Sequence, residues 1–132
     1  MSEQNVAVVR EAIDAFTALD FDRWKATAHE SIKLYPRPEE PGVRSCYEGM
    51  DGLIAYLGNW YSGWAEYTAE PVEWLDKGDY VVVDFREVGV AKDSGIRVEE
   101  TFAHAFKVEG GKIAEWRMFG PIDEALAAIG AD

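Results

Sequence analysis

Apolar residues recur every three or four positions near the start of the chain, which is the spacing of an amphipathic helix. The stripe formed by Val6, Val9, Ile13 and Phe16 predicts a helix from residue 2 to about residue 19. Three further helices are expected, near residues 22–29, from residue 50 or 51 to about 61, and from Pro121 to Gly130. Three prolines within residues 36–41 predict a loop between the second and third helices.

Elsewhere apolar and polar residues alternate, as in strands with one buried face. Strands are expected over residues 32–35, 67–75, 80–91, 96–108 and 113–119. Pro71 interrupts the second strand and places it at a sheet edge or a bulge. Tight turns join the later strands into a meander that must curl to close on the helices. We therefore predict a single α+β domain over residues 1–132, with a strongly curved antiparallel sheet and helices packed on its concave face.

Two long predicted strands agree on which of their side chains face inward. A tight turn at residues 93–94 fixes the pairing of these side chains: Phe85 with Phe102, Val83 with His104, and Glu87 with Glu100. The inner face then changes from apolar residues at one end to the two glutamates at the other, as in a ligand cavity with a polar mouth. Alternatively, both glutamates lie at the solvated end of the sheet and have no function.

His104 lies in the middle of this inner face, where a histidine needs hydrogen-bond partners. A two-residue turn before the last strand would bring Arg117 opposite His104. A three-residue turn with a glycine bulge would instead bring Trp116 there and Met118 next to Phe102. We expect the second arrangement, because it keeps a charged arginine out of the interior. His104 is then either a structurally satisfied core residue or a proton carrier in acid–base chemistry.

Composition and charge exclude some classes of partner. The 132 residues include 25 acidic and 13 basic side chains, a formal net charge of −12, so the surface repels nucleic-acid phosphate and anionic lipid. No segment has the length of a transmembrane helix, and the first residues lack the pattern of a signal peptide. The single cysteine, Cys46, excludes an intrachain disulfide. We expect a cytoplasmic protein without nucleic-acid or membrane partners.

Aromatic residues make up 13% of the chain, so they either fill the core or line a cavity for an apolar ligand. The second interpretation gives eight candidate lining residues: Trp24, Tyr35, Tyr56, Trp60, Phe85, Phe102, Trp116 and Met118. The candidate catalytic residues are His104, Glu87 and Glu100. Cysteines and histidines do not have the spacing of a zinc site, and we expect neither a metal nor another cofactor.

Several segments, in order, resemble the SnoaL-like family of the nuclear transport factor 2-like (NTF2-like) superfamily. They are VREAIDAFTALDFDRWKATAHESI near the start, YEGMDGLIAYL before the third helix, DKGDYVVVDFREVGVAKDSG and EETFAHAFKVEGGKIAEW in the hairpins, and GPIDEALAAIG at the end. The resemblance implies a cone-like, cystatin-like fold, a pocket between sheet and helices, and frequent homodimers. A dimer would use the outer sheet face, toward which Val82, Ala103 and Ala105 point.

In the polyketide cyclases of this superfamily, a histidine on the penultimate long strand works with an acid on the last strand. His104, in the run FAHAF, matches the histidine, whereas the acid position falls on Met118, which cannot transfer a proton. The resemblance implies a small, mostly apolar ligand in the pocket, with isomerase-, lyase- or hydrolase-type acid–base activity. The alternative is a non-catalytic binding or dimeric association module.

Overall fold

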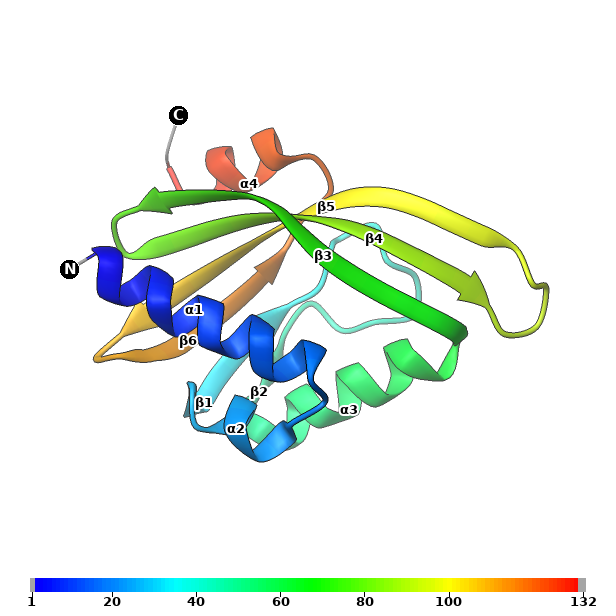
Figure 1. Cartoon of the computed structure of the whole chain (residues 1–132), viewed down its shortest axis with the longest axis horizontal. Helices are drawn as coiled ribbons and strands as arrows, with labels where there is room; N and C mark the ends of the chain where they lie inside the picture. Colours follow the sequence, from blue (N-terminus) through cyan, green and yellow to red (C-terminus); the bar gives the residue numbers. More distant parts are fainter. Residues whose placement is uncertain (1, 131–132) are drawn as a thin grey trace.

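The order of helices and strands in the computed structural model follows the sequence pattern closely (Figure 1). The structure describes residues 2–130. Within them the helices are α1 (Ser2–Thr17), α2 (Phe21–Lys25), α3 (Gly49–Ser62) and α4 (Ile122–Ala128). The strands are β1 (Ala28–Tyr35), β2 (Tyr47–Glu48), β3 (Trp64–Lys77), β4 (Tyr80–Ala91), β5 (Arg97–Glu109) and β6 (Lys112–Met118). Over this range, each helix is too short or too polar to cross a membrane.

The region between α1 and α3 differs from its predicted bounds. α2 ends at Lys25 and β1 begins at Ala28, so His29 lies on a strand and not at the end of a helix. β1 begins early because it pairs with β6 from its first residue, with Ala28 opposite Ile113. The His29 ring instead contacts the end of β5, where its Nε2 lies 2.8 Å from the carbonyl oxygen of Glu109.

The strands form one curved sheet in the order β2-β1-β6-β5-β4-β3. Neighbouring strands are antiparallel except β1 and β6, which are parallel because α3 and the β3–β5 meander separate them in the chain. β3 lies at an edge and its register shifts between Pro71 and Glu73, as the proline predicts. The concave face of the sheet is turned toward α1, α2 and α3 (Figure 1), so the main core lies between these layers.

The final helix, α4, lies on the opposite face of the sheet (Figure 1). It covers the patch that we expected to mediate dimers, because Val82, Ala103 and Ala105 are fully buried in a cluster with Ala125 of α4. The expectation that these side chains form an exposed apolar surface is therefore wrong. The chain stays on this face after β6 because Ala103 N–H donates to the carbonyl oxygen of Gly120 over 3.0 Å.

The last hairpin has neither of the registers considered above. Its turn contains two residues, both glycines with positive φ, a conformation that favours glycine. An extra residue on β6, Ala114, then shifts the pairing so that Met118, and not Trp116, lies opposite His104. The predicted pairing of His104 with Trp116 is therefore wrong. Because the bulge restores the alternation, Trp116 and Met118 still face the interior of the cone.

The burial of the outer patch under α4 predicts the effect of a charge there. Val82→Asp should lower the free energy of unfolding by about 3 kcal/mol or more, because a carboxylate would lie in an apolar cluster without a partner. Thr101→Asp, at an exposed position of the adjacent strand, is the control and should change it by about 0.5 kcal/mol or less. Urea unfolding measures both. A fully stable Val82→Asp variant would contradict this packing.

Candidate functional site

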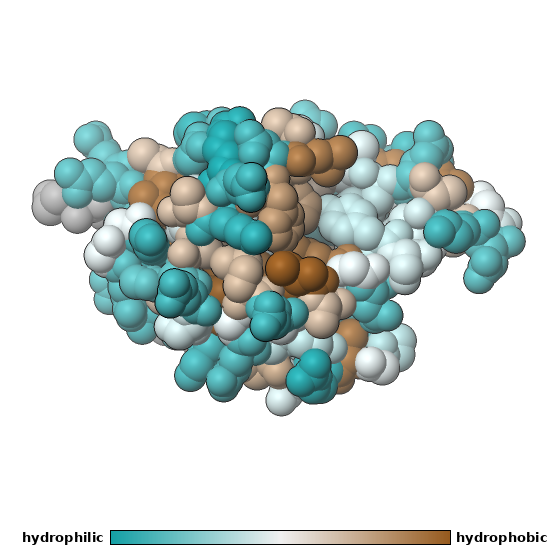
Figure 2. Space-filling model, turned by 90° about the horizontal axis from the view of Figure 1, so that it is seen from below, coloured by the Kyte–Doolittle hydropathy of each residue, from teal (hydrophilic) through white to brown (hydrophobic). Residues whose placement is uncertain are grey.

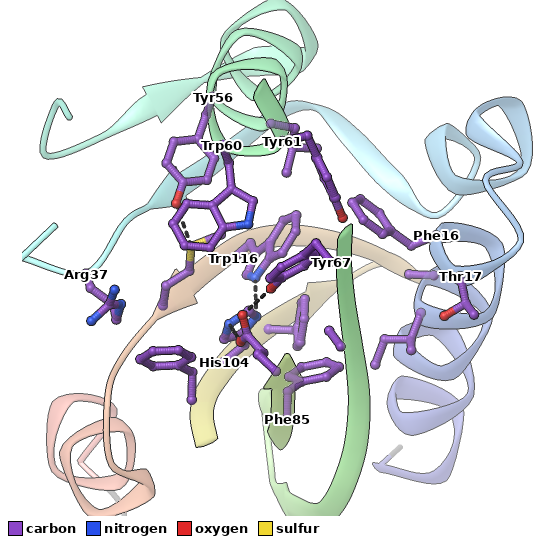
Figure 3. Close-up of a pocket in the computed structure, with 18 of the residues that line it drawn as sticks. Phe16, Thr17, Arg37, Tyr56, Trp60, Tyr61, Tyr67, Phe85, His104 and Trp116 are labelled. Carbon is purple, nitrogen blue, oxygen red and sulfur yellow. Dashed lines mark hydrogen bonds and ion pairs between the residues drawn. The ribbon is translucent and has the colours of Figure 1, made fainter. Parts of the chain in front are cut away.

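A cavity of about 100 Å³ lies between the concave face of the sheet and the three helices beneath it (Figure 3). Strands β3 to β6 form one side of it, and α1, α2 and α3 form the other. The proline-rich loop adds Arg37 and Glu40. The lining side chains are mostly large: Phe16, Trp24, Tyr56, Leu57, Trp60, Tyr61, Tyr67, Phe85, Glu87, Phe102, His104, Phe106, Trp116 and Met118 are among them.

Aromatic rings dominate the wall and fix one another in place. Trp116 stacks on Phe106 with 5.6 Å between ring centroids and meets Phe16 edge to face at 6.3 Å. Tyr67 meets Trp60 and Tyr61 edge to face at 5.8 and 5.5 Å. Such pairs stabilise specific ring orientations beyond the burial of their surface. The cavity therefore has a preformed apolar wall that suits a flat or cyclic apolar ligand.

Glu87 is the acidic group inside this apolar cavity, and only 7% of it is exposed. Its Oε1 accepts a hydrogen bond from the Tyr67 hydroxyl. Its Oε2 lies 3.5 Å from Nε2 of His104, which is longer than an ordinary hydrogen bond. Within residues 2–130, this oxygen is buried and has no hydrogen-bond partner. A buried carboxylate oxygen without a partner is costly, so it is an acceptor available to a bound molecule.

His104 is held in one orientation by the indole of Trp116. Trp116 Nε1 donates to Nδ1 of His104 over 3.0 Å (Figure 3). An indole nitrogen only donates, so Nδ1 must present its lone pair, and the proton of the neutral ring lies on Nε2. That N–H is directed toward Glu87. Trp116 therefore orients His104 through a hydrogen bond, and His104 faces the carboxylate without bonding to it.

The tyrosines of the cavity stay protonated. Burial raises the pKa of Tyr67, and the charge and hydrogen bond of Glu87 raise it further. Burial also raises the pKa of Tyr61, with a smaller contribution from Glu87. The pKa of Tyr56 is raised by burial and by its hydrogen bond to Glu40 Oε1, which is 2.8 Å long. Near neutral pH all three hydroxyls are therefore donors and cannot act as bases.

The rim of the cavity is polar, but not through the residues predicted from sequence. Arg37 lies over the ring of Phe102, with its guanidinium carbon 4.3 Å from the ring centroid, and it is 4.0 Å from Glu39. Glu40 holds the hydroxyl of Tyr56. The proline-rich loop therefore places a partly exposed cation and a partly exposed carboxylate on the lining of the cavity.

Two of the candidate site residues lie outside the cavity. Glu100 is exposed, because β6 ends opposite His104 and leaves the far end of β5 without a neighbour on that side. Tyr35 lies beside Arg117, the β6 residue opposite it, with the guanidinium carbon 5.6 Å from its ring centroid. Its neighbour on β1, Leu34, takes the inner face. The other candidates line the cavity: His104, Glu87, Trp24, Tyr56, Trp60, Phe85, Phe102, Trp116 and Met118.

Sequence reasoning missed Tyr67, the hydrogen-bond donor to Glu87. The strand that contains Tyr67 was predicted, but the face of the sheet toward which Tyr67 points depends on the register shift between Pro71 and Glu73. Arg37 and Glu40 were also missed, because they belong to a loop whose path no periodicity describes. The prolines that frame both residues were the one available signal, since they restrict the conformations of the loop.

The curved sheet, the helices on its concave side and the cavity between them define an NTF2-like protein. A protein of unknown function from Burkholderia pseudomallei K96243, described as NTF2-like, superposes with a TM-score of 0.79 at 23% identity, over 97% of this chain and 98% of that one. A protein with a cystatin-like fold from Xanthomonas campestris superposes with a TM-score of 0.77 at 18% identity, over 87% and 88% of the two chains.

TerC, crystallised with polyporic acid, is similar at a TM-score of 0.78 and 18% identity, over 97% of this chain and 99% of that one. At the level of sequence, residues 9–116 match the model of the SnoaL-like domain, and the chain belongs to this family. The search of curated proteins gave no match.

The hydrogen bond from Tyr67 predicts a stability effect. Tyr67→Phe should lower the free energy of unfolding by about 1–3 kcal/mol near pH 7, because it leaves both oxygens of a buried carboxylate without a neutral donor. Tyr80→Phe is the matched control, since Tyr80 donates over 3.2 Å to Glu115, a carboxylate that is less buried than Glu87. It should cost about 0.5 kcal/mol or less. Equal losses in the two variants would contradict the role of Tyr67.

The raised pKa values of the tyrosines predict a loss of stability in alkali. Tyr35, Tyr56, Tyr61 and Tyr67 have a higher pKa in the folded chain than the ordinary value near 10. Above pH 10 the unfolded chain therefore loses these protons first, and the free energy of unfolding falls as pH rises. Absorbance at 295 nm should show these phenols ionising later than in the unfolded chain. Stability that is flat from pH 9.5 to 11.5 would contradict this.

Proposed function

We propose that the cavity binds a small, mostly apolar molecule with a carbonyl group, and that Glu87 moves a proton on it. The observation that carries the proposal is the Glu87 carboxylate, buried among aromatic rings with one oxygen free to accept a proton. Membership of the SnoaL-like family, and the similarity to TerC, which was co-crystallised with polyporic acid, support a role with small molecules.

Glu87, and not His104, is assigned as the proton acceptor. His104 has no free lone pair in the arrangement described above, because Trp116 occupies Nδ1 and the proton lies on Nε2. Its Nε2–H is instead a donor. The distance of 3.5 Å to Glu87 Oε2 leaves this donor and the carboxylate unsatisfied by each other, so both can bind atoms of a ligand.

The pair suits the removal of a proton next to a carbonyl group. The C–H bond breaks, its proton moves to Glu87 Oε2, and its electron pair forms an enolate. The Nε2–H of His104 donates to the enolate oxygen, where the negative charge develops. Glu87 then returns the proton to the same carbon or, where the ketone is β,γ-unsaturated, to the γ-carbon, which shifts the double bond. This is isomerase-type chemistry, and it needs no acid at Met118.

Proton exchange tests this assignment directly. The protein should catalyse exchange of the α-protons of aryl alkyl ketones with deuterium from D₂O, followed by nuclear magnetic resonance. Glu87→Gln should keep the ketone affinity but lower the exchange rate at least about 100-fold, because the amide cannot take the proton. Glu115→Gln is the matched control, because Glu115 lies on β6 outside the cavity and also accepts a hydrogen bond from a tyrosine, Tyr80. This variant should keep the parent rate.

Two results would contradict the proposal in different ways. Ketones that bind without exchanging would favour the non-catalytic binding alternative. An exchange rate that is unaffected by Glu87→Gln but lost in His104→Gln would return the role of base to the histidine. His104→Gln should otherwise lower the rate without abolishing exchange, since it removes only the donor to the enolate oxygen.

A further inference from the structure

A second hollow lies on the outside of the helical layer, where α1, α2 and α3 meet. It has a volume of about 310 Å³ and is lined by Ala15, Phe16, Leu19, Asp20, Phe21, Trp24, Ile54, Leu57, Gly58 and Tyr61, which we call the helix groove. Several of these side chains are unusually exposed for apolar residues, Leu19 at 85% and Ile54 at 43%. Figure 2, which views the molecule from below, shows hydrophobic side chains gathered in the middle of this face between hydrophilic margins.

The helix groove and the inner cavity share one wall. Phe16, Trp24, Leu57 and Tyr61 line both of them. Within this wall Phe16 and Tyr61 stack with 5.9 Å between ring centroids, one from α1 and the other from α3. Neither ring is fully buried: Phe16 is partly exposed and Tyr61 is 36% exposed. A turn of these two side chains would join the two spaces.

Two positions in the groove go against local backbone preferences. Leu19 has φ of +57°, a left-handed conformation that favours glycine at the end of a helix. The exposed leucine side chain does not offset this strain by burial within the chain. Gly58 lies within α3, where alanine would stabilise the helix, and a Cβ atom at this position would meet nothing within 4 Å. Leu19 thus adds apolar surface beside the groove, and Gly58, which has no side chain, leaves the groove open.

We propose that the helix groove binds the apolar chain of an elongated ligand whose carbonyl head lies at Glu87 and His104. The chain passes between Phe16 and Tyr61 and lies along Ile54 and Leu19. The substrate class is then a ketone or related carbonyl compound with an alkyl or acyl tail, which extends the function proposed above. The shared wall favours this occupant over a partner protein, because a tail that starts in the cavity and passes the side chains lining both spaces enters the groove.

A homologous series of 1-phenylalkan-1-ones tests the inference, with alkyl chains of one to ten carbons and affinities measured by titration calorimetry. Once the cavity is full, each further methylene should raise the affinity about threefold to fourfold, the gain for burying one such group. A plateau after the short members would overturn the inference. The gain should persist in Glu87→Gln, because it depends on the groove and not on proton transfer.

Two variants separate the groove from the cavity. Ile54→Glu places a charge at an exposed groove position, and Gly58→Leu fills open space while favouring the helix. Both should remove the gain with chain length and leave the affinity of the shortest ketone unchanged. Ile96→Glu, at a 62% exposed apolar position on the far hairpin, is the matched control and should behave as the parent does.

The outcomes distinguish this inference from the function on which it rests. Short ketones that fail to bind, while long ones bind with sensitivity to Ile54→Glu, would support the groove and contradict the proposed carbonyl site. If short ketones bind and exchange protons, but longer alkyl chains do not raise the affinity, the carbonyl site would be supported and the groove contradicted. Sedimentation tests whether a second copy of the chain occupies the groove instead. The inference would be overturned if the parent were a dimer that Ile54→Glu dissociates, and if the length of the ketone's alkyl chain had no effect on affinity.

Discussion

The structure depends on keeping one carboxylate, Glu87, away from water. Moving an ionised side chain into an apolar space is costly unless donors reach it. Tyr67 on β3 donates to Oε1, whereas the Nε2–H of His104 on β5 is directed at Oε2 from 3.5 Å, too far for an ordinary hydrogen bond. His104 is in turn fixed by Trp116 on β6. The polar chain therefore crosses four neighbouring strands, and it exists only if the registers of all four are correct.

The curvature of the sheet makes this chain possible. Glu87 is opposite Glu100, whereas His104 is opposite Val83, four residues away along β4. Four residues span roughly 13 Å in an extended strand, which is too far for two side chains on a flat sheet to meet easily. On a concave surface the side chains converge, and the two groups approach to 3.5 Å. The same concavity closes the sheet over the helices, so the fold and the site have one geometric origin.

The regular part of this arrangement was predictable, and the irregular part was not. The β4–β5 hairpin has no register shift, so side-chain alternation and a tight turn were enough to predict its pairing, which is confirmed. The two flanking strands, β3 and β6, each contain a register shift. The shift near Pro71 decides the face of the sheet on which Tyr67 lies, and the shift at Ala114 does the same for Trp116. A bulge moves the alternation by one residue and leaves little trace in composition.

The same limit applies to long-range packing. Small side chains on the outer sheet face are equally consistent with a dimer interface or with a helix lying against them, and the sequence pattern does not distinguish the two. The structure has α4 on that face. Glu100 and Tyr35 were placed at the site for a similar reason, since strand parity alone does not tell where the neighbouring strand ends or which side of β1 faces the cavity.

Met118 shows how the site can work without the acid that resemblance to cyclases leads one to expect. It lies directly opposite His104, and its sulfur is 3.5 Å from the hydroxyl oxygen of Tyr56, whose proton is donated to Glu40. An acid at Met118 would place negative charge on the β6 side of the imidazole. Here β6 supplies the Trp116 indole donor instead, and the carboxylate lies on β4. Because the carboxylate lies on the other side of the ring, His104 directs its N–H toward Glu87, and in the proposed mechanism Glu87 accepts the proton.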